Sequence, residues 1–504
     1  MQDEHSPAER PRDLDTPRQV TPESAASAPL RDRPRQLETP SRNGCRLLML
    51  GMVAFAAASP CLLCCGGWYY LQRQARKALK VELTRIRDQE GPFEISEILK
   101  PRSWHQDKPE AAKYWLQAFE ALDDPQFIAD FDAIEELLSG VSPAPAPGKA
   151  WPKKQVADRL VTKHARALTL LRQAREQGVG VFPISFSVDK RPEFAGLSAA
   201  RRAISLLRLK AYCAAHNGDT SGAAAALMDT LGLARLLQRQ PTIRPQIAGF
   251  ACIESAWSSL QDLMPGNNWN QQDLIAVQSA FVQGRTHSSL SAALLGERAL
   301  AIAIFRYGDN IALEQLAEGP EDILQAEEIQ QPEDLLYALQ NYRKLIQAMQ
   351  KPFAKTIPIF QTIEDEMEQE SRGLGSVRYP VTNAIFPNAA AVLIACASTH
   401  ARHITAYEGI ALERFRQVTG VFPQELRQLE GQSANVRPLD PFDSQPLRYL
   451  APANRTDPAT VYSVGQNLVD DNGDPAEDAD GIPLDLVFRV TSSPRQIGVP
   501  PLKK

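Results

Sequence analysis

Apolar residues recur at helical spacing through the middle of the chain. Between about residues 108 and 378, segments such as PEAAKYWLQAFEALDD, DRLVTKHARALTLLRQAREQG and PEDLLYALQNYRKLIQAMQKP place apolar side chains three and four positions apart. Short breaks containing Pro, Gly or Asn-Gly separate these segments. The pattern predicts an irregular domain of helical hairpins over residues 108–378.

One part of this region predicts a specific pair of helices. The stretch LSAARRAISLLRLKAYCAAHNGDTSGAAAALMDTLGLARLLQRQP has a turn at residues 216–219, and Asp219 is suited to cap the second helix. Its small residues allow close helix packing, and it resembles a single hairpin of the tetratricopeptide type. No repeat at a fixed period extends the pattern, which favours an ordinary irregular helical domain.

Polarity changes abruptly near the N-terminus. Residues 1–45 are polar and rich in Pro, Arg and acidic residues, which predicts a disordered tail. Residues 46–72 contain an uncharged apolar stretch, LLMLGMVAFAAASPCLLCCGGWYYLQ, that is long enough for one transmembrane helix. Aromatic residues at its far end favour the membrane interface over a buried core helix. Residues 73–107 follow as a charged juxtamembrane helix and a linker that breaks at Gly91-Pro92.

A second uncharged stretch occupies residues 379–401, YPVTNAIFPNAAAVLIACASTHA. Pro and Asn in its first half leave too short an apolar core for a second span. We therefore expect a buried helix over residues 387–417. Gly420 is suited to end it in a left-handed cap.

The C-terminal residues 385–492 predict a small α+β module. The long helix is followed by LDPFDSQPLRYL, then by VYSVG, an acidic loop and LDLVFRV, which read as strands of a small antiparallel sheet. Residues 493–504 are expected to form a flexible tail. The predicted fold class is mainly α, with a single transmembrane helix, the helical-hairpin domain and this module.

The C-terminal module contains, in order, ALERFRQVTGVFP, LDPFDSQPLRYL, VYSVG, an acidic loop and a final strand that starts with Asp. In this order of motifs it is similar to the globular domain of the type II secretion major pseudopilin. The resemblance covers roughly residues 404–490. It implies a pseudopilin-like fold in the periplasm and a calcium-binding loop. The ligands that it implies, carried over by position, are Asp470, Asn472, Asp474, Asp478 and Asp480. The chain departs from that family because the module lies some 400 residues from the N-terminus and no prepilin cleavage motif precedes it.

The acidic loop allows two interpretations on chemical grounds. Calcium takes six to eight oxygen ligands, which clustered carboxylates can supply. An EF-hand is excluded, because Pro475 stands where that motif needs Gly and Gly481 stands where it needs Glu. The alternative is a solvated acidic loop without a bound cation. His400 and His403, three residues apart on the predicted helix, lack a third metal ligand nearby and favour an ordinary helix role.

Composition and motifs limit the functional classes. The 504 residues carry a formal net charge of −5, which provides no global basic field for nucleic acid. No nucleophile elbow, zinc-protease, P-loop or dinucleotide motif occurs. We expect a single-pass protein of the bacterial inner membrane with periplasmic C-terminal domains. Membrane lipid and unidentified envelope or secretion proteins are its expected partners, in a structural or interaction role. The alternative is an envelope enzyme with its site in a cleft of the helical domain.

Overall fold

The structure is a computed structural model that describes residues 67–93, 97, 109–140, 143–179, 184–187, 190–194, 196–265, 268–282, 286–307, 329–373, 375–429, 438–454 and 457–491. The predicted disordered tail, most of the predicted transmembrane helix and the C-terminal tail 493–504 lie outside the described residues. The chain divides into two units, Met1–Trp68 and Tyr69–Lys504. The fold described below belongs to the second unit.

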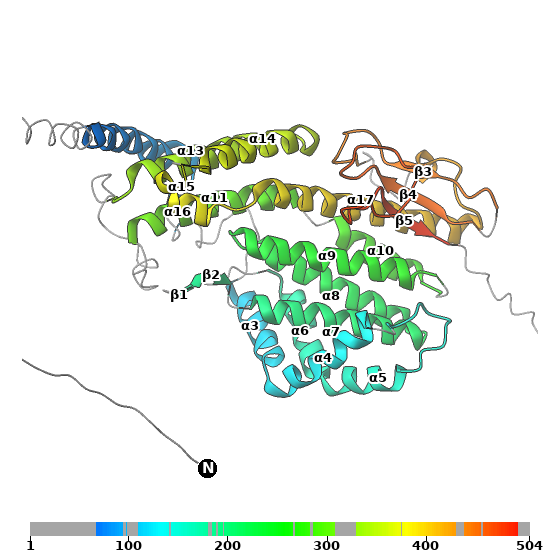
Figure 1. The fold of residues 1–504 in the computed structure, drawn as a ribbon. Coiled ribbons are helices and arrows are strands. Elements are labelled where there is room, and N and C mark those ends of the chain that lie inside the picture. Colours follow the sequence, from blue (N-terminus) through cyan, green and yellow to red (C-terminus); the bar gives the residue numbers. More distant parts are fainter. Residues whose placement is uncertain are drawn as a thin grey trace, which may run out of the picture. The chain divides into compact units, whose positions relative to one another are not determined.

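Helices dominate this unit, and a small antiparallel sheet follows them, which confirms the predicted mainly helical class at this level. The helices up to the centre of the unit are α3 (Pro109–Leu122), α4 (Pro125–Ser139), α5 (Lys154–Lys163), α6 (Ala165–Gln177), α7 (Leu197–His216), α8 (Thr220–Gln238), α9 (Ile243–Leu263) and α10 (Gln271–Val282). They are followed by α11 (Thr286–Tyr307), α13 (Pro332–Ala348), α14 (Phe353–Ser371), α15 (Gly375–Arg378), α16 (Pro380–Ile385) and α17 (Ala389–Thr419). Figure 1 shows their arrangement.

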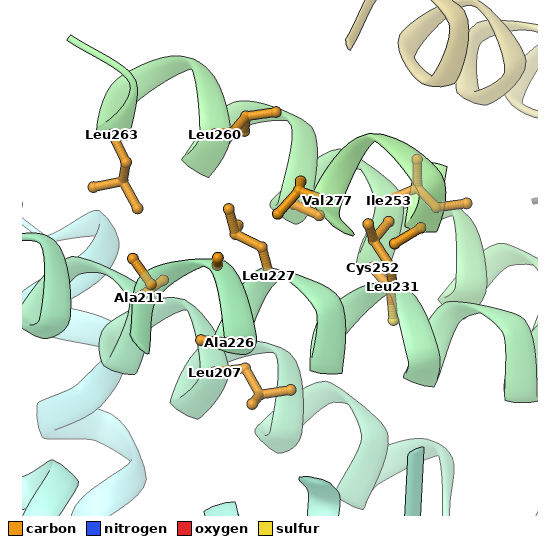
Figure 2. Close-up of a cluster of buried hydrophobic side chains, with 14 of the residues drawn as sticks. Leu207, Ala211, Ala226, Leu227, Leu231, Cys252, Ile253, Leu260, Leu263 and Val277 are labelled. Carbon is orange, nitrogen blue, oxygen red and sulfur yellow. The ribbon is translucent and has the colours of Figure 1, made fainter. Parts of the chain in front are cut away.

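The predicted hairpin at residues 197–241 is confirmed as α7 and α8. Asp219 caps α8, because its Oδ1 accepts a hydrogen bond of 2.8 Å from the backbone N–H of Gly222. Both helices pack against α9, and buried side chains such as Leu207, Leu231 and Ile253 fill the space between the three helices (Figure 2). The burial of this apolar surface is the main source of stability for these helices.

The region predicted as helical also contains a β-hairpin. Strands β1 (Ile184–Ser187) and β2 (Lys190–Phe194) pair antiparallel between α6 and α7, with Ile184 opposite Phe194. The stretch ISFS alternates apolar and polar residues, which is the strand period. The sequence did not predict this hairpin, because four residues are too few for the strand period to be distinguished from its helical surroundings.

The segment predicted to be juxtamembrane is packed on the folded unit. Residues 69–85 are α-helical, η1 (Ile86–Glu90) continues the helix, and Gly91 ends it with a φ of 107°, at the predicted break. Leu79, Leu83 and Ile86 share an apolar cluster with side chains of α11 and α13. The helix, drawn in blue in Figure 1, is therefore anchored by buried contacts from Leu79 to Ile86, while its first residues are exposed.

The predicted buried helix is α17, and Gly420 caps it in the left-handed conformation with a φ of 84°. Asn388 caps its N-terminus, so Pro387 lies just outside the helix rather than in its first turn. Gln271–Arg306 and Pro380–Thr419 are each long and apolar enough to cross a membrane by length and composition alone. In α17 the apolar residues pack against α9, α10, α11 and α14, which is the behaviour of a core helix.

The same helix carries the C-terminal sheet. Strands β3 (Arg448–Leu450), β4 (Ala459–Ser463) and β5 (Leu486–Val490) form an antiparallel sheet in the order β3-β4-β5, at the positions that the sequence predicts. Strands β4 and β5 pair with Val461 opposite Phe488, and both strands lie on α17. Because α17 also contacts four helices, the sheet and the helical region share one structural element.

Candidate functional site: the acidic loop of the C-terminal sheet

The acidic loop joins β4 to β5 over residues 464–485, all of which the structure describes. It is built from tight turns, since Leu468 and Asn472 have φ values of 59° and Gly473 and Gly481 have φ values of 74° and 75°. Leu468 and Val469 are 61% and 53% exposed, so two apolar side chains accompany the acidic residues at the surface. Positive φ is unusual for leucine, and surrounding contacts must hold it.

A buried aspartate joins this loop to the start of the sheet. Asp440 is 1% exposed, and its Oδ1 accepts hydrogen bonds from the Phe442 backbone N–H at 3.0 Å and the Ser463 hydroxyl at 2.8 Å. Its Oδ2 accepts from the Val464 backbone N–H at 3.0 Å and from Nη1 of Arg448 at 3.3 Å. Burial raises the pKa of Asp440, while these donors stabilise its charged form.

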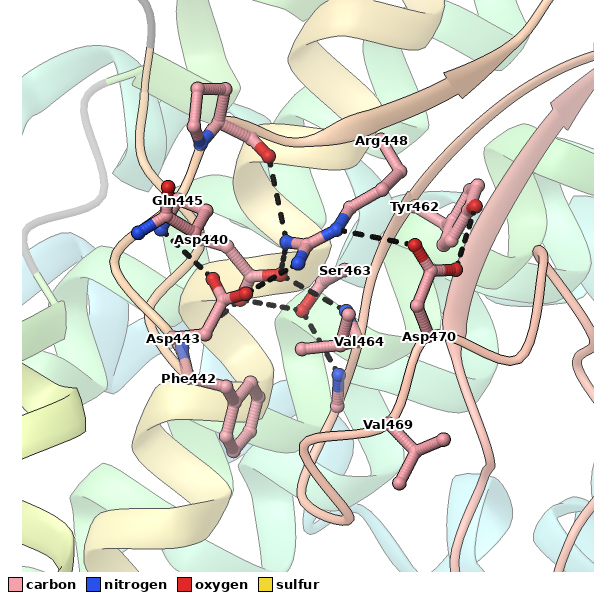
Figure 3. Close-up of polar contacts among 12 residues, drawn as sticks. Asp440, Phe442, Asp443, Gln445, Arg448, Tyr462, Ser463, Val464, Val469 and Asp470 are labelled. Atoms are coloured by element: carbon pink, nitrogen blue, oxygen red, sulfur yellow. Dashed lines mark hydrogen bonds and ion pairs between the residues drawn. The ribbon is translucent and has the colours of Figure 1, made fainter.

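Arg448 connects this centre to the acidic loop, as Figure 3 shows. It pairs with Asp443, and its Nε lies 3.7 Å from Oδ2 of Asp470. Asp470 also accepts a hydrogen bond of 2.9 Å from the Tyr462 hydroxyl. One of the predicted calcium ligands is thus already engaged by an arginine and a tyrosine.

The other predicted ligands form local turns. Asp474 accepts from the backbone N–H of Ala476 at 3.0 Å, and Oδ1 of Asp478 accepts from the N–H groups of Asp480 and Ile482, each at 2.9 Å. Asn472 donates its backbone N–H to Asp470 at 3.1 Å. The side chains of all five predicted ligands are exposed.

These five side chains do not converge on one point. Within the part of the chain that the structure describes, no group of three or more His, Cys, Asp or Glu residues is arranged to hold a metal ion. The hydrogen bonds of the loop explain this, because the carboxylates of Asp470, Asp474 and Asp478 are turned towards nearby N–H or hydroxyl donors. A cation at this loop would have to draw the carboxylates away from those donors.

The sequence did not predict Asp440 or Arg448 as parts of the site, and it missed Asp485 as well. Asp485 directly precedes β5 and is 1% exposed, and its Oδ2 accepts a hydrogen bond of 2.8 Å from the backbone N–H of Gly473. Its Oδ1 is buried and accepts no hydrogen bond of ordinary geometry, although the nearby backbone N–H groups of Asp471 and Asp474 favour the charged form of the carboxylate. Burial raises the pKa of Asp485, and the nearby negative charge of Asp471 adds to this effect. The signal in the sequence was an aspartate within the apolar strand segment LDLVF.

The histidine pair of α17 belongs to the core. His403 is 4% exposed and meets the ring of Phe281 edge-on at 5.7 Å, and His400 lies 5.8 Å from the ring of Phe353. Burial lowers the pKa of His400 to about 4 and that of His403 to about 3. Both side chains are therefore neutral packing groups near neutral pH.

The fold and site define a class of architecture: a mainly helical chain whose last long helix also carries a three-stranded antiparallel sheet with an acidic loop. No protein-family model, curated protein or solved structure matches the chain.

Proposed function

We propose that the chain is a single-pass protein of the bacterial inner membrane that serves as a structural or interaction protein in the envelope. In this proposal residues 46–72 cross the membrane, and the pseudopilin-like C-terminal module faces the periplasm, where it binds envelope or secretion partners. The observation that carries the proposal is the juxtamembrane helix. It begins within the predicted span and is buried against α11 and α13 through Leu79, Leu83 and Ile86.

This packing fixes the helix on the folded unit. Leu79, Leu83 and Ile86 are held against α11 and α13, whereas a flexible linker would make no such buried contacts. The exposed apolar residues Leu468 and Val469 on the loop then offer a contact for a protein partner.

Crosslinking in native membranes, followed by affinity purification of the full chain, tests the proposal. We expect secretion or pilus-like envelope components to be recovered with the wild-type chain. We also expect their yield to fall for the double variant Leu468→Ser/Val469→Ser. A matched control is Val156→Ser, which changes an apolar residue that is 38% exposed on α5. Recovery of no envelope component, or equal recovery with all three chains, would contradict the interaction role.

We also propose calcium as the cation of the acidic loop. The unpartnered Oδ1 of Asp485 supports this proposal, because a buried carboxylate oxygen without a donor is costly and a cation would satisfy it. Asp471 and Asp474 lie beside Asp485 in the loop. The negative charge of Asp471 raises the pKa of Asp485, and the backbone N–H of Asp485 donates a hydrogen bond of 3.0 Å to the carbonyl of Asp474. Asp485 would supplement the five ligands implied by the pseudopilin resemblance, and the loop carboxylates that now face backbone donors would have to turn towards the ion.

A calcium titration of the full chain in detergent, followed by its melting temperature, tests this site. A free calcium concentration of about a hundred times Kd would stabilise the folded chain by about 2.7 kcal/mol. We expect Asp485→Asn to abolish the shift and Asp457→Asn, in the exposed turn before β4, to leave it unchanged. The absence of a shift at millimolar calcium would refute the site.

A further inference from the structure

The helix formed by residues 69–85 has two faces of different chemistry. Its inner face carries Leu79 and Leu83, which are 0% and 3% exposed and pack on α11 and α13. The acidic residue Glu82 also points inward, at 6% exposure, and pairs with Arg343 of α13 at 3.1 Å. The inner face is thus apolar and acidic, and the folded unit covers it.

The end of the helix repeats this arrangement. Glu90, the last residue of η1, pairs with Arg298 of α11 at 2.9 Å. The Arg298 side chain is fully buried, so Glu90 is directed into the unit. Two of the three acidic residues of the segment 73–90 are thereby neutralised on the inner side, and Asp88 is the third and is exposed.

The outer face of the same helix is basic. Arg73, Lys77 and Lys80 are exposed, and their spacing of four and three residues places them on one side of the helix, opposite Glu82. Among the residues that the structure describes, no carboxylate forms an ion pair with any of the three. These three residues are called the basic face below.

Large amphipathic side chains precede the basic face on the same helix. Trp68, Tyr69, Tyr70 and Leu71 are 65%, 63%, 61% and 54% exposed. Exposed Trp and Tyr rings favour the layer between the hydrocarbon core and water. The order along the helix, aromatic residues and then basic ones, matches the order of layers at a membrane surface.

We propose that the basic face binds the phosphate groups of anionic phospholipids, an inference that rests on the proposed membrane anchorage of residues 46–72. The helix rise of about 1.5 Å per residue places Arg73 to Lys80 within about 12 Å of the end of the span. The headgroup layer and one screening length of about 8 Å cover that distance. The folded unit occupies the inner face of the helix, and lipid headgroups reach the outer one.

The charge of the whole chain favours lipid over nucleic acid as the polyanion. The formal net charge of −5 repels extended polyanions, while a headgroup needs to approach only one helix face. Each basic side chain near an anionic surface strengthens attraction to it by about fivefold in affinity.

Reconstitution of the full chain into vesicles of phosphatidylcholine, with or without 30% phosphatidylglycerol (about one anionic lipid in three), tests the proposal. Flotation reports vesicle binding. Labelling of amines with a membrane-impermeant reagent, read by mass spectrometry, reports access to Lys77 and Lys80. Lys149, exposed in the connector between α4 and α5, is the internal control. The matched variant is Arg73→Gln. The rate at which Lys77 and Lys80 are labelled in this variant is compared with the rate in the wild-type chain.

With phosphatidylglycerol present, we expect labelling of Lys77 and Lys80 to slow by about fivefold or more, and Lys149 to be unaffected. About 0.5 M NaCl should reverse the protection, because it shortens the screening length to a few ångströms. Arg73→Gln should weaken it.

Flotation with both vesicle types but equal labelling of the two lysines would leave the anchorage intact and overturn the basic face. A chain that floats with neither vesicle type would overturn both proposals. Flotation only with phosphatidylglycerol would refute the apolar span and, with it, the placement of the basic face beside the bilayer. Equal protection by double-stranded DNA in detergent would overturn the choice of lipid.

Discussion

At Gly409, α17 closely approaches Phe488 of β5, and replacement of this glycine by alanine tests the packing of the module. A Cβ atom at Gly409 would lie 2.2 Å from Cδ1 and 2.4 Å from Cε1 of Phe488. Ordinary contact begins at 3.4 Å, so the helix or the ring would have to yield by about 1.2 Å, the difference between 3.4 and 2.2 Å. Phe488 is 0% exposed, which leaves its ring no free space to enter.

The expected free-energy change combines two opposing effects. Overpacking of a filled core costs about 1–3 kcal/mol. Alanine is favoured over glycine in a helix interior by about 1 kcal/mol. Because a fully buried aromatic ring is the obstacle, we expect a cost near the top of the range and a net destabilisation by Gly409→Ala of about 1–2 kcal/mol.

Urea unfolding of the full chain in detergent measures this change. Trp257 lies 6.2 Å from the ring of Phe488 and reports on the interface between helix and sheet through its fluorescence. Phe488→Leu alone should also destabilise the chain, but in the double variant the smaller side chain makes room for the alanine. The double variant should therefore be more stable than the sum of the single effects by about 1 kcal/mol. Gly409→Ala with wild-type stability or better would refute the close approach.

Three further predictions concern buried and capping groups. Because burial lowers the pKa values of His400 and His403 to about 4 and about 3, the unfolded chain takes up protons that the folded chain does not. As the pH drops below 6.5, the free energy of unfolding should thus decrease by about 1.4 kcal/mol per pH unit for each histidine. The dependence of the unfolding free energy on pH should be weaker for His403→Leu than for the wild-type chain. Asp440→Asn, which loses charge-assisted hydrogen bonds in a buried site, should destabilise the chain by about 2–4 kcal/mol in urea. The half-exposed Asp443→Asn should cost under about 1 kcal/mol, and equal costs would contradict the central role of Asp440. Asp219→Ala should lower stability by about 1 kcal/mol and Asp219→Asn by less, since only the alanine removes the cap of α8; equal effects of the two variants would count against the cap.

The local features of the fold could be predicted because neighbouring residues decide them. The helix period of residues 197–238, the cap at Asp219 and the left-handed end at Gly420 all depend on contacts within a few positions of the chain. The strands of the C-terminal sheet were predicted for the same reason, since turn residues bracket short apolar runs. The acidic loop was therefore placed correctly between β4 and β5.

The arrangement of side chains within the site depends on residues that are distant in the sequence. Arg448 holds Asp470 from the opposite edge of the sheet, and the buried position of Asp485 depends on a hydrogen bond to Gly473, twelve residues away. The docking of the helix formed by residues 69–85 and η1 likewise depends on distant residues, such as Arg298, which lies 208 residues from its partner Glu90. Periodicity and composition report the identity of a residue and its immediate neighbours. Burial and pairing follow from packing, and only the tertiary structure could show which carboxylates are satisfied and which oxygen lacks a partner.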